Sequence, residues 1–371
     1  MSSKFLVDSH IHLFRDEHLS SLAWMTPENP LNGQHSIGEY LSSTSHSTIS
    51  RRSLGFVFVE TDRKCHLADD SGWKGPLEEF EFVYKAGTGK DLRYRDSAKA
   101  VLGIVPWAPL PKGRGAMQRY RAQLREISDE KNEGVKIRLL KGFRYLLQFN
   151  PPGFMLDGSF IDSLKWMGEE GYVFELTVDC RGKGLWQLEE AVELLKRAHG
   201  GVQEDKKVRL IVAHKDHLAK PDLQVAPKDL ATNPFFSTWK THLKSIAAFP
   251  NTYIKLSGAF SELPPALLEQ QDKSREEWLA NILEYVQPWV FAAIDIFGTK
   301  GAIWGSDWPV CTINGGKEKA WGLWAEITDR LLEARQLNEL EKDSIWWGNA
   351  LRAYQIEVED GLHVGLVGSR I

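Results

Sequence analysis

The sequence is poor in cysteine: its 371 residues include only Cys65, Cys180 and Cys311. These lie far apart in no metal-binding spacing, which excludes a disulfide framework and predicts reduced thiols in a cytoplasmic protein. No apolar run is long enough to cross a membrane, and the short run Phe5–Val7 before Asp8 is too short for a signal peptide. A basic stripe is also lacking, and the formal net charge of -4 argues against a nucleic-acid partner.

The sequence does contain a regular alternation of short β-branched or aromatic runs with longer helical patterns. The expected strands lie near Phe5–Leu13, Ser53–Thr61, Ala100–Pro109, Val135–Arg144, Tyr172–Cys180, Val208–His214, Thr252–Phe260 and Ala302–Trp308. The expected helices are Pro76–Tyr84, Ala116–Glu130, Phe160–Glu170, Leu185–Ala198, Phe236–Ala248, Arg275–Tyr285, Ala320–Ala334 and Leu337–Ala353. Eight such repeats predict an α/β fold, a single (β/α)₈ TIM barrel over residues 1–371, with an open doubly wound sheet as the alternative.

Two connections are unusually long for a compact domain. The first follows strand one, from Phe14 to Arg52, and the second follows strand two, from Asp62 to about Ser97. Both begin where a strand ends, and in a barrel that face carries the active site. We therefore expect both loops to overhang the site.

The motif Asp8-Ser-His10-Ile-His12 lies on the first strand. Alternate residues of a strand face the same side, so His10 and His12 point together into the barrel interior. Two imidazoles at the end of a buried strand suit a divalent metal such as zinc. An isolated pair of this kind is more often two hydrogen-bonded histidines, and the partners that follow favour the metal.

A further histidine at the end of strand six would complete a three-histidine set. Two candidates are present, since His214 directly ends the apolar run and His217 lies in the stretch Asp-His-Leu-Ala-Lys-Pro. We expect only one of them to be a ligand and favour His217, with His214 as the alternative.

Asp307 ends strand eight within Trp304-Gly-Ser-Asp-Trp-Pro309. A carboxylate there is costly to bury unless it binds a metal or accepts hydrogen bonds. Beside a metal and a water it would serve as ligand and general base together. The alternative is an aspartate that caps the next helix.

These residues resemble the amidohydrolase superfamily, and within it the amidohydrolase-related branch of sugar-lactone and dicarboxylate-lactone hydrolases. Two more stretches carry the resemblance, Lys255-Leu-Ser-Gly258 and Gly348-Asn-Ala350. The resemblance implies one metal, zinc being expected, that is held by His10, His12, His217 and Asp307. Some relatives work without a metal. Matching the Lys-Pro of the family selects His217 as the third ligand, whereas matching the strand register selects His214.

Other positions are expected to hold the substrate. Arg144 matches an arginine-containing stretch of the lactonases and would grip a carboxylate or polarise a carbonyl, or else form a surface ion pair. Lys220 would help to orient the substrate. Further expected contacts are Glu60, Trp24 and Trp308. Glu175 and Asp179 share a face of strand five, so one of them points into the site or both are structural.

The sequence therefore predicts a hydrolase that opens the lactone of a sugar acid or a related small carboxylate, with Asp307 activating water. The alternative within the same superfamily is a lyase that decarboxylates an aromatic or muconate-type acid without oxidation. A third hypothesis is a non-catalytic barrel that binds a ligand. The partner is a small molecule in each case, and the oligomeric state is open.

Overall fold

The computed structural model describes residues 4–130, 132, 135–213, 223–268 and 274–358. Eight strands alternate with helices along the chain, as the sequence predicts. The strands are β1 (Phe5–Ile11), β2 (Arg52–Val59), β3 (Val101–Val105), β4 (Gly142–Leu146), β5 (Val173–Thr177), β6 (Arg209–Ala213), β7 (Thr252–Leu256) and β8 (Ala302–Trp304). The first seven α-helices are α1 (Ile37–Ser45), α2 (Lys74–Gly87), α3 (Gly113–Ser128), α4 (Gly158–Glu169), α5 (Trp186–His199), α6 (Pro234–Ala247) and α7 (Pro265–Leu268).

The carboxyl-terminal part is helical after β8. Its helices and the long helix before it are α8 (Arg275–Phe297), α9 (Thr312–Gly315), α10 (Ala320–Ala334), α11 (Glu339–Asp343) and α12 (Asn349–Tyr354), with a π-helical turn at Ser344–Gly348. Local chemistry sets several helix starts, because a polar side chain accepts an otherwise unpaired backbone N–H. Asp157 caps α4, Asn233 caps α6 before Pro234, and Ser274 forms a capping box with Glu277 at α8.

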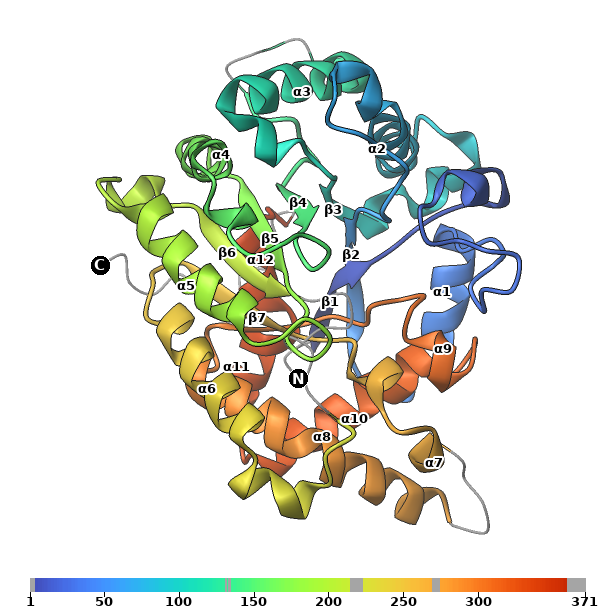
Figure 1. The fold of residues 1–371 in the computed structure, drawn as a ribbon. Coiled ribbons are helices and arrows are strands. Elements are labelled where there is room, and N and C mark those ends of the chain that lie inside the picture. The colour runs from blue at the N-terminus through green and yellow to red at the C-terminus, as the bar shows by residue number, and fades with distance from the viewer. Residues whose placement is uncertain (1–3, 131, 133–134, 214–222, 269–273, 359–371) are drawn as a thin grey trace.

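The strands are parallel and form a ring with the helices outside it (Figure 1). Extended ladders pair β1-β2-β3 and β4-β5-β6-β7-β8. Isolated parallel bridges join the two sheets, Ile104 to Leu140 and Trp107 to Arg144 at one junction and Ile11 to Trp308 at the other. The predicted (β/α)₈ barrel is therefore confirmed, and the carboxyl ends of β1 and β8 lie side by side.

Some predicted element bounds are wrong. Residues 135–141 are not part of a strand: β4 begins only at Gly142, although Leu140 already bridges to β3. Helix α8 continues to Phe297, twelve residues beyond the predicted end, with Pro288 inside it. Its buried apolar side chains continue past the proline, so packing overrides the local penalty. Strand β8 ends at Trp304, short of the predicted end at Trp308, and Asp307 in the following segment has a left-handed backbone, with φ of 60°.

The two long connections contain their own structure. The first carries a 3₁₀ turn at Asp16–Ser21 and helix α1, and the second carries α2 and a 3₁₀ segment at Leu92–Ala100. Trp24 joins them, because its Nε1 donates to Thr61 O at 2.8 Å. Many tryptophans pack the core rather than line a pocket, and seven are fully buried: Trp73, Trp166, Trp239, Trp289, Trp304, Trp324 and Trp346. Among the described residues, no helix has the length and apolar character needed to span a bilayer.

Candidate active site

His10 and His12 lie at the end of β1 and face each other inside the barrel. Both are buried, and their Nε2 atoms are 3.3 Å apart. Their rings meet edge to face, with centroids 4.9 Å apart. The predicted shared orientation of alternate strand residues is therefore confirmed.

Asp307 reaches the same point from the segment after β8. Its Oδ1 lies 3.4 Å from Nε2 of His12 and 3.9 Å from Nε2 of His10. The backbone holds it there, since Asp307 N donates to His10 O at 2.9 Å and His12 N donates to Trp308 O at 2.8 Å. A positive φ on a non-glycine residue is uncommon and often marks a functional position.

The three side chains suit a divalent metal. One donor atom from each of His10, His12 and Asp307 lies within 4.8 Å of the other two. Two nitrogens bound tetrahedrally to zinc at about 2.0–2.1 Å are themselves about 3.3–3.4 Å apart, and the two Nε2 atoms match that separation. Two imidazoles and a carboxylate are also the ligand types that catalytic zinc uses.

The surroundings of His12 prepare it as a ligand. Its Nδ1 lies 2.9 Å from Val59 O, a carbonyl that only accepts, so Nδ1 carries the hydrogen and Nε2 keeps its lone pair. Burial lowers the pKa of His12, which favours the neutral ring, and the charge of Arg144 acts in the same direction. Second partners of this kind fix the ring orientation of metal-binding histidines.

His10 has a different second partner, Lys255 on β7. Nζ of Lys255 lies 2.7 Å from Nδ1 of His10 and 2.7 and 2.9 Å from the carboxylate oxygens of Glu175 on β5. An ammonium donates to Nδ1 and leaves the hydrogen of a neutral His10 on Nε2, whereas an amine accepts from Nδ1–H and frees Nε2. Burial lowers the pKa of Lys255 to about 8.

Tyr354, at the end of α12, closes this network. Its hydroxyl donates to Oε1 of Glu175, and the tyrosine is 1% exposed. Glu175 thus receives hydrogen bonds from both Tyr354 and Lys255. Of the two strand-five acids considered, Glu175 points into the site region.

Asp8 ties β1 to the segment that carries Asp307. Its Oδ1 accepts from Ser306 N at 2.9 Å, and its Oδ2 accepts from Trp321 Nε1 at 2.8 Å and from Tyr40 OH at 3.1 Å. Burial raises the pKa of Asp8, while hydrogen bonds from Ser306, Trp321 and the His10 backbone lower it. The carboxylate of Asp8 therefore links the first strand to the segment after the eighth strand by a hydrogen bond.

Arg144 forms a buried ion pair with Glu60 rather than a surface one. Its Nε donates to Glu60 Oε1 at 2.6 Å and its Nη2 donates to Glu60 O at 2.5 Å, with Arg144 4% and Glu60 0% exposed. Nη1 makes no hydrogen bond with any described residue. Glu60 also accepts from Asp62 N at 2.6 Å, so it positions Arg144 instead of offering a free carboxylate.

The remaining predicted residues divide into two groups. Trp308 is 2% exposed and its ring packs on His35 and Tyr40, and Trp24 bridges the two long loops. Their predicted contact with substrate stays a prediction, and Trp308 offers little open surface for it. The others, His214, His217 and Lys220, lie outside the described residues.

Comparisons with known proteins give the family of this chain. A family model described as Amidohydrolase matches residues 202–356. The chain is 30% identical over 363 residues to an L-rhamnono-gamma-lactonase of Scheffersomyces stipitis, covering 96% of this chain and 100% of that protein. It is 28% identical over 221 residues to an L-fucono-1,5-lactonase of Burkholderia multivorans, covering 58% of this chain and 63% of that protein.

The fold has solved counterparts. A crystal structure of an amidohydrolase from Burkholderia multivorans with bound zinc superposes with a TM-score of 0.64 at 22% identity, over 95% of this chain and 100% of that one. The lactonase relative and the family model together identify the barrel as a hydrolase. The chain belongs to the amidohydrolase family, as the predicted resemblance implies.

Sequence reasoning missed the roles of Lys255 and Tyr354. In the sequence, Lys255 was noted only as part of the stretch Lys255-Leu-Ser-Gly258 that carries the family resemblance. Its contact with His10 spans 245 positions. The contact of Tyr354 with Glu175 spans 179 positions, and no local pattern marks it. Val59 O is a backbone atom and carries no sequence signal.

Proposed function

We propose that this protein hydrolyses the lactone of a sugar acid to the open hydroxy acid. One observation carries the proposal: donor atoms of His10, His12 and Asp307 converge within 4.8 Å of one another at the catalytic end of the barrel. The lactonase relative that aligns over 96% of this chain supports the choice of substrate class.

Asp307 would act as the general base. Its carboxylate takes a proton from a water molecule as the water oxygen attacks the lactone carbonyl carbon, which gives a tetrahedral intermediate. When that intermediate collapses, the bond from the carbonyl carbon to the ring oxygen breaks. The proton returns from Asp307 to the leaving ring oxygen, so the products are a hydroxyl and a carboxylic acid on one molecule.

The other residues would orient and polarise. The guanidinium of Arg144, fixed by Glu60, places a positive charge near the site, where its Nη1 is open to bind the carbonyl oxygen or a substrate carboxylate. We propose zinc as the metal held by His10, His12 and Asp307, with His217 or His214 as a further ligand and Lys220 as a substrate contact. When bound, the ion would lower the pKa of a water molecule and polarise the carbonyl.

The proposal extends to cell location and domain count. Cys65, Cys180 and Cys311 form no disulfide with one another, which supports a reducing compartment such as the cytoplasm. The parallel ring joined by bridges on both sides supports a single domain.

A substrate panel tests the function. The purified protein would be incubated with L-rhamnono-γ-lactone and L-fucono-1,5-lactone, and separately with an aromatic carboxylic acid. A pH indicator would follow acid release and a coupled assay would follow carbon dioxide. Acid release from a lactone that Asp307→Asn abolishes supports the proposal. Carbon dioxide release without lactone opening would instead select the decarboxylase alternative.

A further inference from the structure

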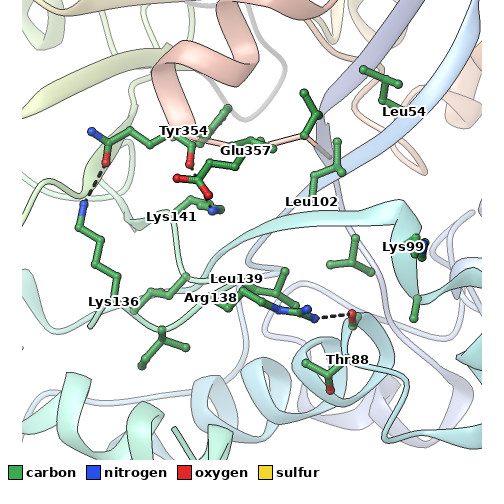
Figure 2. Close-up of a pocket in the computed structure, with 18 of the residues that line it drawn as sticks. Leu54, Thr88, Lys99, Leu102, Lys136, Arg138, Leu139, Lys141, Tyr354 and Glu357 are labelled. Atoms are coloured by element: carbon green, nitrogen blue, oxygen red, sulfur yellow. Dashed lines mark hydrogen bonds between the residues drawn. The ribbon is translucent and has the colours of Figure 1, made fainter. Parts of the chain in front are cut away.

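A large cavity lies at the amino-terminal ends of strands β2 to β5, away from the candidate active site (Figure 2). Its volume is about 1290 Å³. The walls come from Leu54 near the start of β2, Val101 and Leu102 at the start of β3, residues 135–141 before β4, and residues 354–358. Because the strands are parallel, this end of the barrel is opposite to the end that carries His12 and Asp307.

The described lining of this cavity is strongly basic. It contains five cationic side chains and one carboxylate, that of Glu357. The cations are Arg95, Lys99, Lys136, Arg138 and Lys141. The whole chain, by contrast, carries a formal net charge of -4. The described lining of the cavity is therefore positively charged, although the chain as a whole has a negative net charge.

Three of these cations are held by neutral acceptors. Lys136 Nζ donates to Gly171 O at 3.0 Å and to Gln355 Oε1 at 2.9 Å. Lys141 Nζ donates to Gln355 O at 3.4 Å, and Arg138 Nη2 donates to Gly87 O at 3.3 Å. Within the described part of the chain, no carboxylate forms an ion pair with any of these three side chains, although Glu130 accepts from the backbone N of Arg138 at 3.0 Å.

Partial burial makes this arrangement costly. Burial lowers the pKa of both Lys136 and Lys141, and neighbouring cations lower them further. Carboxylates offset part of this lowering, Glu170 at Lys136 and Glu357 at Lys141. A cation that is partly removed from water is stabilised by an anion brought close to it.

The cavity also has an apolar side. Val101, Leu139, Leu140 and Ile356 are buried in its floor. Figure 2 shows Leu54 and Leu102 at the upper right, across the cavity from Lys136 and Lys141 at the left. A ligand that fits both sides carries negative charge at one end and an apolar face at the other.

We propose that this cavity binds a phosphorylated small molecule of the chemical class of a nucleoside diphosphate. Its phosphates would lie among Lys136, Arg138 and Lys141, and its ring would pack on Leu54 and Leu102. Guanidinium and ammonium groups are the usual protein partners of phosphate oxygens. Small-molecule sites have volumes of about 300–1,000 Å³. The cavity of about 1290 Å³ is therefore large enough for a nucleoside diphosphate.

The test measures binding of ADP to the full-length protein by isothermal titration calorimetry at low ionic strength, with inorganic pyrophosphate as a second probe. The double variant Lys136→Gln/Lys141→Gln is expected to weaken ADP binding at least about fivefold. Glu357→Gln removes a negative charge and is expected to tighten binding about twofold to threefold. Lys183→Gln, an exposed lysine in the segment after β5, is the matched control and leaves affinity unchanged.

Opposite shifts in the two cavity variants support the proposal, and tighter binding of ADP than of pyrophosphate supports the apolar half of it. Absence of ADP binding by the wild-type protein at millimolar concentration overturns it. The proposal is also overturned if Lys183→Gln lowers the affinity for ADP as much as the double variant does. That result would indicate non-specific charge attraction. Glu357 is exposed, so its variant keeps the test decisive even where the double variant fails to fold.

Discussion

Nζ of Lys255 lies 2.7 Å from Nδ1 of His10, and both side chains are fully buried. This contact links the metal-binding face of His10 to the pair formed by Lys255 and Glu175. The orientation of the His10 ring therefore depends on a fully buried residue that, in the proposed reaction, does not contact the substrate.

Lys255→Met is expected to lower kcat/KM for the lactone by about 10–100-fold, because His10 loses its partner and Glu175 loses its cation. Steady-state kinetics would measure this, and Lys244→Met, at an exposed position on α6, serves as the control. Activity within twofold of the wild type would show that Lys255 does not position His10.

Asp307→Asn is expected to lower kcat at least about 100-fold while KM changes little, since the amide keeps the shape but cannot accept the proton. Circular dichroism would check the fold, and Asp295→Asn, at an exposed position on α8, is the matched control. Undiminished turnover in the Asp307 variant would remove this site from catalysis.

Glu60→Gln and Arg144→Lys are each expected to raise KM about tenfold or more. Lysine cannot reproduce the two donations that Arg144 makes to Glu60, and the glutamine leaves the guanidinium without its counter-charge. The measurement is KM and kcat over a range of lactone concentrations. Unchanged KM in both variants would assign the pair to stability alone.

His12→Ala is expected to weaken zinc binding by at least about 100-fold, because the ring offers a lone pair that is oriented in advance by Val59 O. Competition against a chromophoric chelator would measure the affinity without reference to activity. His46→Ala, at an exposed position after α1, controls for surface histidines. Equal zinc affinity in the two variants would contradict the ligand assignment.

Stability is expected to fall in mild acid through buried histidines. Burial lowers the pKa of His199 from its ordinary value of 6.5, so below that pH the unfolded chain binds more protons than the folded protein. The contribution of these groups to the free energy of unfolding therefore decreases as the pH falls below about 6.5. His18, whose pKa burial lowers to about 3, acts in the same direction.

Urea unfolding at several pH values checks this. His199→Gln keeps a donor near Val208 O, which His199 Nε2 contacts at 3.1 Å, and removes one titrating group, so its stability should depend less steeply on pH. His46→Gln should leave the slope unchanged. Identical slopes in all three proteins would show that His199 does not contribute.

The sequence predicted the barrel and the convergence of His10, His12 and Asp307 for physical reasons that act locally. Alternation along β1 places His10 and His12 on one face, and the apolar run before Asp307 marks the strand that it follows. The contacts of Lys255 with His10 and of Tyr354 with Glu175 join segments 245 and 179 positions apart, and no local pattern encodes them. The length of α8 was missed because buried packing carries the helix past Pro288.

The hydrogen bond from Tyr354 to Glu175 has a consequence for biosynthesis. A ribosome makes His10 near the beginning and Tyr354 roughly 20 to 70 s later, at about 5–20 residues per second. Until then the amino-terminal end of the nascent barrel lacks Tyr354. The carboxylate of Glu175 therefore lacks the hydrogen bond that the Tyr354 hydroxyl donates. The growing chain must therefore carry the imidazoles of His10 and His12 through most of translation before the residues that surround them are complete.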